Sequence, residues 1–247
     1  VKLYQDLTRF RMKDNNVAPL IDLEIKRLTF MREHSVSSDK DQLYLDGLKS
    51  LYGMHPDHEG SSEVQSYIAS YYNERGNSYS LETPDNRWDK KKALTICSIA
   101  IKRFPDSYGA KLCQQLTSTI EGKVLTSENE IAYAKSDNGR LRISYKNVDS
   151  LYFRIVKVAS DFYAKKRYYG REVVEQLLEM EVTKEWNLKL ENPGDYQNHS
   201  TEILLPKLDY GQYAILASPS KSFTRKNNII LSDSYWVTDL AYTYSTN

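Results

Sequence analysis

The sequence predicts an α+β fold with two domains, a helical array followed by an antiparallel β-sandwich. Apolar residues recur at three- to four-residue spacing through the first half of the 247-residue chain, which is the period of a helix. From about Val124 the period shifts to two, which is the period of a strand. We therefore expect a helical domain over residues 1–122 and a sandwich domain over residues 123–247.

The first half contains one-sided helices that pair into hairpins. The clearest pair has apolar positions from Ala93 to Phe104, then the segment PDS, then further apolar positions from Leu112 to Ile120. Two other segments carry the same apolar stripe. Its positions are Val17, Ile21, Ile25, Leu28 and Met31 in one segment, and Val64, Tyr67, Ile68, Tyr71 and Tyr72 in the other.

An internal echo supports a repeated hairpin. HPDHEG at His55–Gly60 recurs as FPDSYG at Phe104–Gly109, an offset of 49 residues. We expect Pro105 to stop one helix and Asp106 to cap the next. Tetratricopeptide repeats have a period of about 34 residues, so the longer offset implies an insertion, which we place at residues 73–91. The first domain is thus predicted to be a tetratricopeptide-like array.

Two cysteines lie in the last hairpin. Cys97 and Cys113 stand at similar distances on either side of the Pro105 turn, so they could face each other. We favour the interpretation that both are buried, reduced thiols that pack as small apolar residues. The alternative is a disulfide between them, if the chain works in an oxidising compartment.

The second half reads as seven or eight strands with one helical insertion. RLRISYKNVDSLYFRIVKV alternates in two runs around a turn at residues 147–150, and we expect a hairpin or a pair of sandwich strands there. Residues 161–180 have a helical pattern instead. Further strand positions that share a face are Trp186, Leu188 and Leu190, and Tyr213, Ile215 and Ala217.

The segment LDYGQY predicts a tyrosine corner of the kind found in immunoglobulin-like sandwiches. Leu208 would fill the core, Gly211 would allow the tight turn, and Tyr213 would bond its hydroxyl to backbone a few residues upstream. These three residues, with Pro105 and Asp106, are therefore predicted to be structural.

Composition excludes several classes of function. The 34 basic and 33 acidic residues nearly cancel and form no long block of one sign, which argues against a nucleic-acid surface or a polybasic membrane patch. No stretch approaches 18 apolar residues. The 10 glycines form neither a dinucleotide fingerprint nor a phosphate loop, so we expect no nucleotide and no other cofactor.

Candidate catalytic and metal-binding residues are few. His55, His58 and Glu59 stand together, but Pro56 interrupts the helix on which a zinc protease carries its ligands, so we expect an exposed turn and no metal. His199 has no nucleophile motif to activate. We expect Asp195, Tyr196 and His199 to hold a loop through hydrogen bonds to backbone, and no enzymatic activity.

Five segments carry a resemblance to a known family. They are ALTICSIAIKRFPDSYGAKLCQQL, ISYKNVDSLYFRIVKV, EWNLKLENPGDYQNHS, EILLPKLDYGQYAILAS and YWVTDLAYTY, of which DYQNHS and LPKLDYGQYAILAS are the most specific. From about residue 43 to its end, the chain resembles the N-terminal region of the large alpha-2-macroglobulin family proteins of Bacteroidetes. That resemblance implies a helical segment followed by a macroglobulin-type sandwich, within a longer polypeptide.

The resemblance also implies a function. It suggests a non-catalytic scaffold segment of an exported protease inhibitor at the periplasm or cell surface, with a lipid anchor outside this chain. Its partners would be later domains of the same polypeptide, and proteases. Trapping relatives carry a thioester between a Cys and a Gln three residues later, whereas Leu116 follows Cys113 and Ala100 follows Cys97 at that spacing.

The alternative is a surface glycan-binding or protein-interaction module of an exported protein. A glycan site would need Trp88, Trp186 and Trp236 exposed in one shallow groove, whereas a scaffold would bury them. Trp186 alternates with Leu188 and Leu190, which favours burial.

Overall fold

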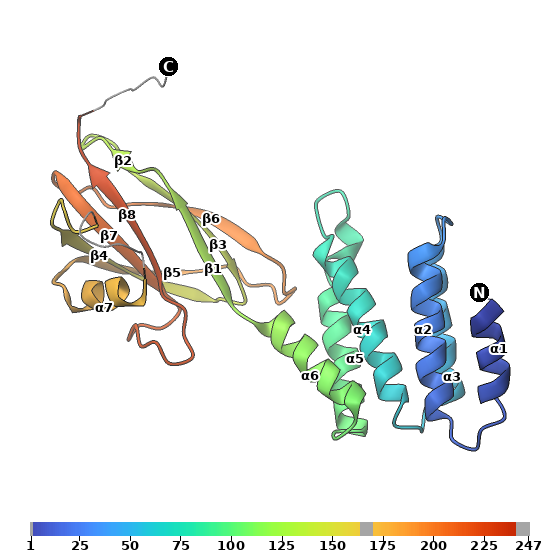
Figure 1. The fold of residues 1–247 in the computed structure, drawn as a ribbon. Helices are drawn as coiled ribbons and strands as arrows, with labels where there is room; N and C mark the ends of the chain where they lie inside the picture. The colour runs from blue at the N-terminus through green and yellow to red at the C-terminus, as the bar shows by residue number, and fades with distance from the viewer. Residues whose placement is uncertain (1, 164–169, 241–247) are drawn as a thin grey trace. The chain divides into compact units, whose positions relative to one another are not determined.

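The chain folds into two compact units (Figure 1). The computed structural model describes residues 2–163 and 170–240. One unit, the helical unit, comprises Val1–Gly122 with Gly194–Gln197, and the other, the sandwich unit, comprises Lys123–Pro193 and Asn198–Asn247. The prediction of an α+β chain with a helical first part and a sheet-rich second part is confirmed. The sequence did not predict that Gly194–Gln197 leaves the sandwich and joins the helices.

The helical unit is a succession of antiparallel helices around two apolar clusters. One cluster joins α2, α3 and α4 through large side chains such as Ile25, Leu48 and Ile68. The other joins α4, α5 and α6, mostly through small ones such as Ala93, Ala100 and Cys113. The elements are α1 (Lys2–Arg11), α2 (Ala18–His34), α3 (Lys40–Met54), α4 (Ser61–Asn77), the 3₁₀ turn η1 (Pro84–Asn86), α5 (Asp89–Arg103) and α6 (Tyr108–Glu121).

Both cysteines lie in the second cluster as buried free thiols. Cys97 comes from α5 and Cys113 from α6, so the two do share the interior of one hairpin. Small residues at these positions let the two helices approach closely.

The predicted insertion is shorter than the sequence suggested. Helix α4 continues to Asn77 and α5 already begins at Asp89, so only residues 78–88 connect them. The buried Asp89 carboxylate pairs with Arg75 Nε at 3.1 Å, which holds the end of one helix to the start of the next. The polar composition suggested a longer loop, because the sequence alone does not show that Arg75 and Asp89 pair with each other.

The two echoed turns lie against each other. Ser62 Oγ and Ser107 Oγ share a hydrogen bond of 2.8 Å, and Arg103 pairs with Asp57. The contact is close enough that a Cβ on Gly109 would stand 2.1 Å from Glu63 N. The sequence echo therefore marks two structurally neighbouring turns.

The predicted helix cap was wrong by one residue. Ser107, not Asp106, is the N-cap of α6, and its hydroxyl accepts a hydrogen bond of 3.1 Å from Ala110 N. Pro105 follows the end of α5 at Arg103, as expected for a residue that cannot continue a helix.

The sandwich unit has two sheets. The strand order is β1-β3-β6 in the three-stranded sheet and β2-β8-β7-β4-β5 in the five-stranded sheet. Strands β2 and β8 are parallel, so the prediction of a wholly antiparallel sandwich was wrong at that pair. The strands are β1 (Val124–Asn129), β2 (Ala132–Tyr133), β3 (Arg140–Lys146), β4 (Ser150–Val158), β5 (Val182–Lys189), β6 (His199–Leu204), β7 (Gly211–Ser218) and β8 (Leu231–Val237).

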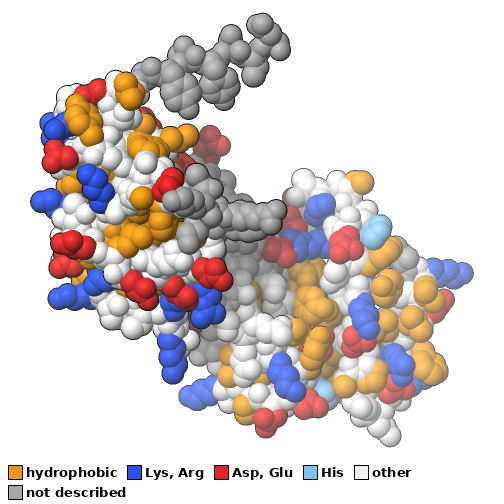
Figure 2. Space-filling model, turned by 60° about the vertical axis from the view of Figure 1, so that its left-hand side comes forward, with side chains coloured by type: hydrophobic (Ala, Val, Ile, Leu, Met, Phe, Trp, Pro, Cys, Tyr) orange, Lys and Arg blue, Asp and Glu red, His pale blue; other side chains and the backbone are white. Residues whose placement is uncertain are grey.

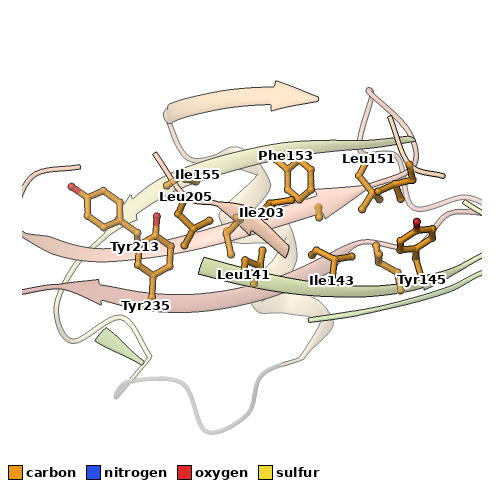
Figure 3. Close-up of a cluster of buried hydrophobic side chains, with 14 of the residues drawn as sticks. Leu141, Ile143, Tyr145, Leu151, Phe153, Ile155, Ile203, Leu205, Tyr213 and Tyr235 are labelled. Carbon is orange, nitrogen blue, oxygen red and sulfur yellow. The ribbon is translucent and has the colours of Figure 1, made fainter. Parts of the chain in front are cut away.

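Alternating side chains build the core between the sheets (Figure 3). Leu141 and Ile143 on β3 face Phe153 and Ile155 on β4 across that core. Because β3 and β4 belong to different sheets, the turn at residues 147–150 is a crossover and not a hairpin. Figure 3 also shows Tyr213 and Tyr235 together at one end of the cluster.

A helix covers the outer face of the five-stranded sheet. Helix α7 (Arg171–Glu179) packs Val173 and Leu177 against Val156 and Leu216. It occupies the C-terminal part of the helical insertion predicted over residues 161–180. Residues 164–169 of that insertion, and residues 241–244 of the segment YWVTDLAYTY, lie outside the described residues.

Replacing Gly109 by Ala should destabilise the helical unit. The new Cβ has no room against the backbone of Ser62 and Glu63, so we expect a loss of about 1–3 kcal/mol in the free energy of unfolding. Gly53→Ala is the matched control, because a Cβ at Gly53 meets nothing within 4 Å. Urea unfolding measures both variants, and equal stability of the two would contradict the close approach of the turns.

Candidate functional site

Gly194–Gln197, which we call the anchor segment, forms a buried polar site in the helical unit. It lies between β5 and β6 in sequence but belongs to the unit made by α4, η1 and α5. Gly194 and Tyr196 have φ angles of 76° and 59°, so the backbone turns sharply at alternate residues. Asp195 and Gln197 are buried, with exposed fractions of 0% and 5%.

Asp195 makes an ion pair with Arg87, the residue that directly follows η1. Its Oδ2 accepts a hydrogen bond of 2.9 Å from Arg87 Nε, and its Oδ1 accepts one of 3.1 Å from Gln197 N. A buried carboxylate is tolerated only when charge and hydrogen bonds compensate its lost hydration. Both oxygens of Asp195 are compensated in this way.

Gln197 and Tyr196 complete the attachment. Gln197 Nε2 donates to the carbonyl oxygens of Gly76 and Arg87, at 3.0 Å and 3.1 Å. Lys90 Nζ donates to the carbonyl oxygen of Tyr196 at 3.3 Å. The Gly76 carbonyl belongs to the last turn of α4, where helices leave backbone acceptors unsatisfied. The anchor segment therefore caps α4 from a distant part of the chain.

The expectation for this loop was partly right. Asp195 does hold a loop through a backbone hydrogen bond, but its ion pair with Arg87, 108 residues away in sequence, was not foreseen. Tyr196 contributes its backbone carbonyl. His199 lies outside the anchor segment, on β6, with its ring 5.9 Å from that of Tyr145.

The tyrosine-corner residues lie together at the start of β7. Tyr213 donates its hydroxyl to the carbonyl oxygen of Asp209 at 2.8 Å, four residues upstream. Leu208 packs against the sandwich core. Gly211 has a φ of 152°, and a Cβ there would stand 2.7 Å from Lys157 Cε. These are the geometric roles that the sequence assigned to the three residues.

Tyr235 is the unexpected neighbour of this corner. Its ring stacks on that of Tyr213 with centroids 5.9 Å apart, and burial raises the pKa of its hydroxyl. Among the described residues, that hydroxyl has no hydrogen-bond partner. The two tyrosines thus differ in hydroxyl pairing while sharing one core.

The candidate metal-binding residues His55, His58 and Glu59 lie in one turn. His58 Nδ1 accepts a hydrogen bond of 3.0 Å from Gly60 N, so it shapes the turn that also contains His55 and Glu59. Within residues 2–163 and 170–240, no three His, Cys, Asp or Glu side chains are grouped to hold a metal ion. The same residues contain no helix with the length and apolar character needed to cross a membrane.

The three tryptophans have different surroundings within their own units. Trp88 is in the helical unit, 41% exposed, with the Arg87 and Lys91 side chains over its ring. Trp186 stacks on Phe153 inside the sandwich, with centroids 4.9 Å apart. Trp236 alternates with the core residues Tyr235 and Val237, so its side chain is on the opposite face of the five-stranded sheet.

Charged side chains of both signs are interspersed over the visible surface of the molecule (Figure 2). This pattern agrees with the near balance of 34 basic and 33 acidic residues.

Comparisons with known proteins place the chain in no family. No family model matches it, and no curated protein matches it. The CARDB domain of a Pyrococcus furiosus protein, solved with di-metal ions, aligns with a TM-score of 0.28 and 12% identity over 47% of this chain and 87% of that one. The alkylpurine DNA glycosylase AlkC of Pseudomonas fluorescens, bound to DNA containing an abasic-site analogue, aligns with a TM-score of 0.26 and 10% identity over 94% of this chain and 62% of that one.

Removing the hydroxyl of Tyr213 should destabilise the sandwich, whereas removing that of Tyr235 should not. Tyr213→Phe loses a buried hydrogen bond and should lower the free energy of unfolding by about 1–2 kcal/mol. Tyr235→Phe removes a buried hydroxyl that lacks a described partner, so stability should stay the same or rise. Thermal unfolding measures both, and an unchanged melting temperature for Tyr213→Phe would contradict the role of the corner.

Proposed function

We propose that this chain is a non-catalytic scaffold segment of an exported, macroglobulin-type protease inhibitor. In this proposal the helical unit is tetratricopeptide-like and the sandwich is macroglobulin-like. The partners are later domains of a longer polypeptide, and proteases. The attachment to the membrane is a lipid anchor outside these 247 residues.

The observation that carries the proposal is the use made of the DYQNHS segment. This segment is among the most specific parts of the resemblance, and two of its polar side chains, those of Asp195 and Gln197, make buried internal hydrogen bonds. Asp195 pairs with Arg87, and Gln197 bonds two carbonyl oxygens of the helical unit. Side chains bonded in this way hold a structure together, which is the role expected in a scaffold.

Two further features support a scaffold. The turns at His55–Gly60 and Phe104–Gly109 stack on each other, as consecutive units of a helical repeat array do. The two-sheet sandwich carries a tyrosine hydroxyl bonded to backbone four residues upstream. The glycan-binding alternative has weaker support, because Trp186 packs against the sandwich core while Trp236 is on the opposite face of the five-stranded sheet.

The proposal is tested with the full-length polypeptide encoded by the gene. It should protect a large protein substrate from trypsin while trypsin still cleaves a small chromogenic peptide, because a macroglobulin-type trap obstructs access and leaves the active site free. The 247-residue chain alone should protect neither substrate. Equal cleavage of the large substrate with and without the full-length polypeptide would refute the inhibitor function, and hydrolysis of any substrate by the chain itself would refute the scaffold assignment.

A further inference from the structure

Strand β5 forms a long open edge of the five-stranded sheet. It pairs with β4 along one side, and within the described residues no strand pairs with its other side. It spans Val182–Lys189 and contains no proline. An exposed edge of this length is a template for pairing with another strand.

The backbone direction of β5 follows from one hydrogen bond. Leu190 N donates to Asp149 O at 2.8 Å, directly beyond the pair Ser150 and Lys189, so Leu190 directs its backbone toward β4. Backbone groups alternate sides along a strand. Glu185, Asn187 and Lys189 therefore direct their N–H and C=O groups to the open edge.

The side chains of these same three residues share one face. Trp186 and Leu188 pack into the core, so the alternate residues Glu185, Asn187 and Lys189 point to the outer face of the sheet. All three are exposed. The edge thus presents a carboxylate, an amide and an ammonium group in that order.

We propose that β5 pairs with β5 of a second copy of this chain, antiparallel and centred on Asn187. In this register Glu185 lies opposite Lys189 of the partner, and Lys189 lies opposite the partner's Glu185. Asn187 lies opposite its own copy, and Trp186 lies opposite the partner's Leu188. The two five-stranded sheets join into one continuous sheet, with backbone hydrogen bonds at each outward-facing pair.

Charge complementarity selects both the occupant and the register. Opposite charges directly across an antiparallel pair stabilise it, and like charges destabilise it. A register centred on Glu185 or on Lys189 would place two like charges opposite each other. A register centred on Trp186 would leave both charges without an opposite charge across the pair. Of these registers, only the one centred on Asn187 places both Glu185 and Lys189 opposite a charge of the other sign.

The other edge strands, β1, β2 and β6, are less suited to pairing with a further strand. Strand β1 is tied to β8 through Ser127 Oγ and Asp233 Oδ2, which are 2.9 Å apart, and β2 has only two residues. Strand β6 is shorter, at six residues, and Pro206 follows it closely. The longest open edge is therefore also the one with a self-complementary charge pattern.

Charge reversal on the intact 247-residue chain tests the pairing by sedimentation equilibrium. The wild type should form a dimer at micromolar to millimolar concentration. Glu185→Lys or Lys189→Glu should weaken the dimer by about tenfold or more, because each change places like charges opposite each other twice. The double variant Glu185→Lys/Lys189→Glu should restore it.

The matched control is Glu202→Lys on edge strand β6. Glu202 and Glu185 are both exposed, and each lies near an arginine of the neighbouring strand, at 3.8 Å from Arg140 and 3.9 Å from Arg154. The control should leave the dimer unchanged. A monomeric wild type, a dimer indifferent to both single reversals, or a double variant that fails to recover while it remains folded by circular dichroism, would each overturn the proposal.

A cysteine at the symmetry centre gives an independent readout of the register. Oxidised Asn187→Cys should form a covalent dimer, because opposite Cα atoms of an antiparallel pair are about 4.5–5.5 Å apart, within the range of a disulfide. Thr183→Cys on the same strand should not, because its copy would lie about 27 Å away. Cross-linking of both variants to the same extent would contradict the register.

Discussion

The buried ion pair between Asp195 and Arg87 is the interaction that holds the anchor segment in the helical unit. Its carboxylate is fully buried, and both Arg87 Nε and Gln197 N donate a hydrogen bond to it. Removing Arg87 would take a charged partner away from a buried carboxylate, and breaking a buried ion pair in this way is strongly destabilising. The anchor segment is therefore held by a constraint that tolerates little change at either position.

That constraint explains why a polar loop is part of a helical unit. The backbone carbonyls in the last turn of α4 need hydrogen-bond donors, and Gln197 Nε2 donates to that of Gly76. Lys90, at the start of α5, bonds the carbonyl of Tyr196. The end of α4 and the Lys90 side chain at the start of α5 thus both bond residues that come more than a hundred positions later in the chain. The helical unit consequently requires more of the sequence than its own helices.

Periodicity alone was enough to predict the two kinds of unit and most of their elements. Apolar stripes such as Ile21 and Ile25 are local, and the tyrosine corner is a pattern of three residues within six positions, so both are visible in the sequence. The anchor segment was not visible, because the pairing of Asp195 with Arg87 depends on the tertiary fold. The parallel pairing of β2 with β8 was missed for the same reason, and the capping role of Ser107 was missed because Asp106 is an equally good cap by residue type.

The central claim is that the anchor segment stabilises the helical unit through the Asp195 and Arg87 pair. A double-mutant cycle of Asp195→Ala and Arg87→Ala measures it most directly, with urea unfolding followed by far-ultraviolet circular dichroism, which the helices dominate. The account predicts that each single variant destabilises the unit strongly and that the two effects are not additive, with a coupling of about 1 kcal/mol or more. Additive effects, or single variants as stable as the wild type, would contradict it.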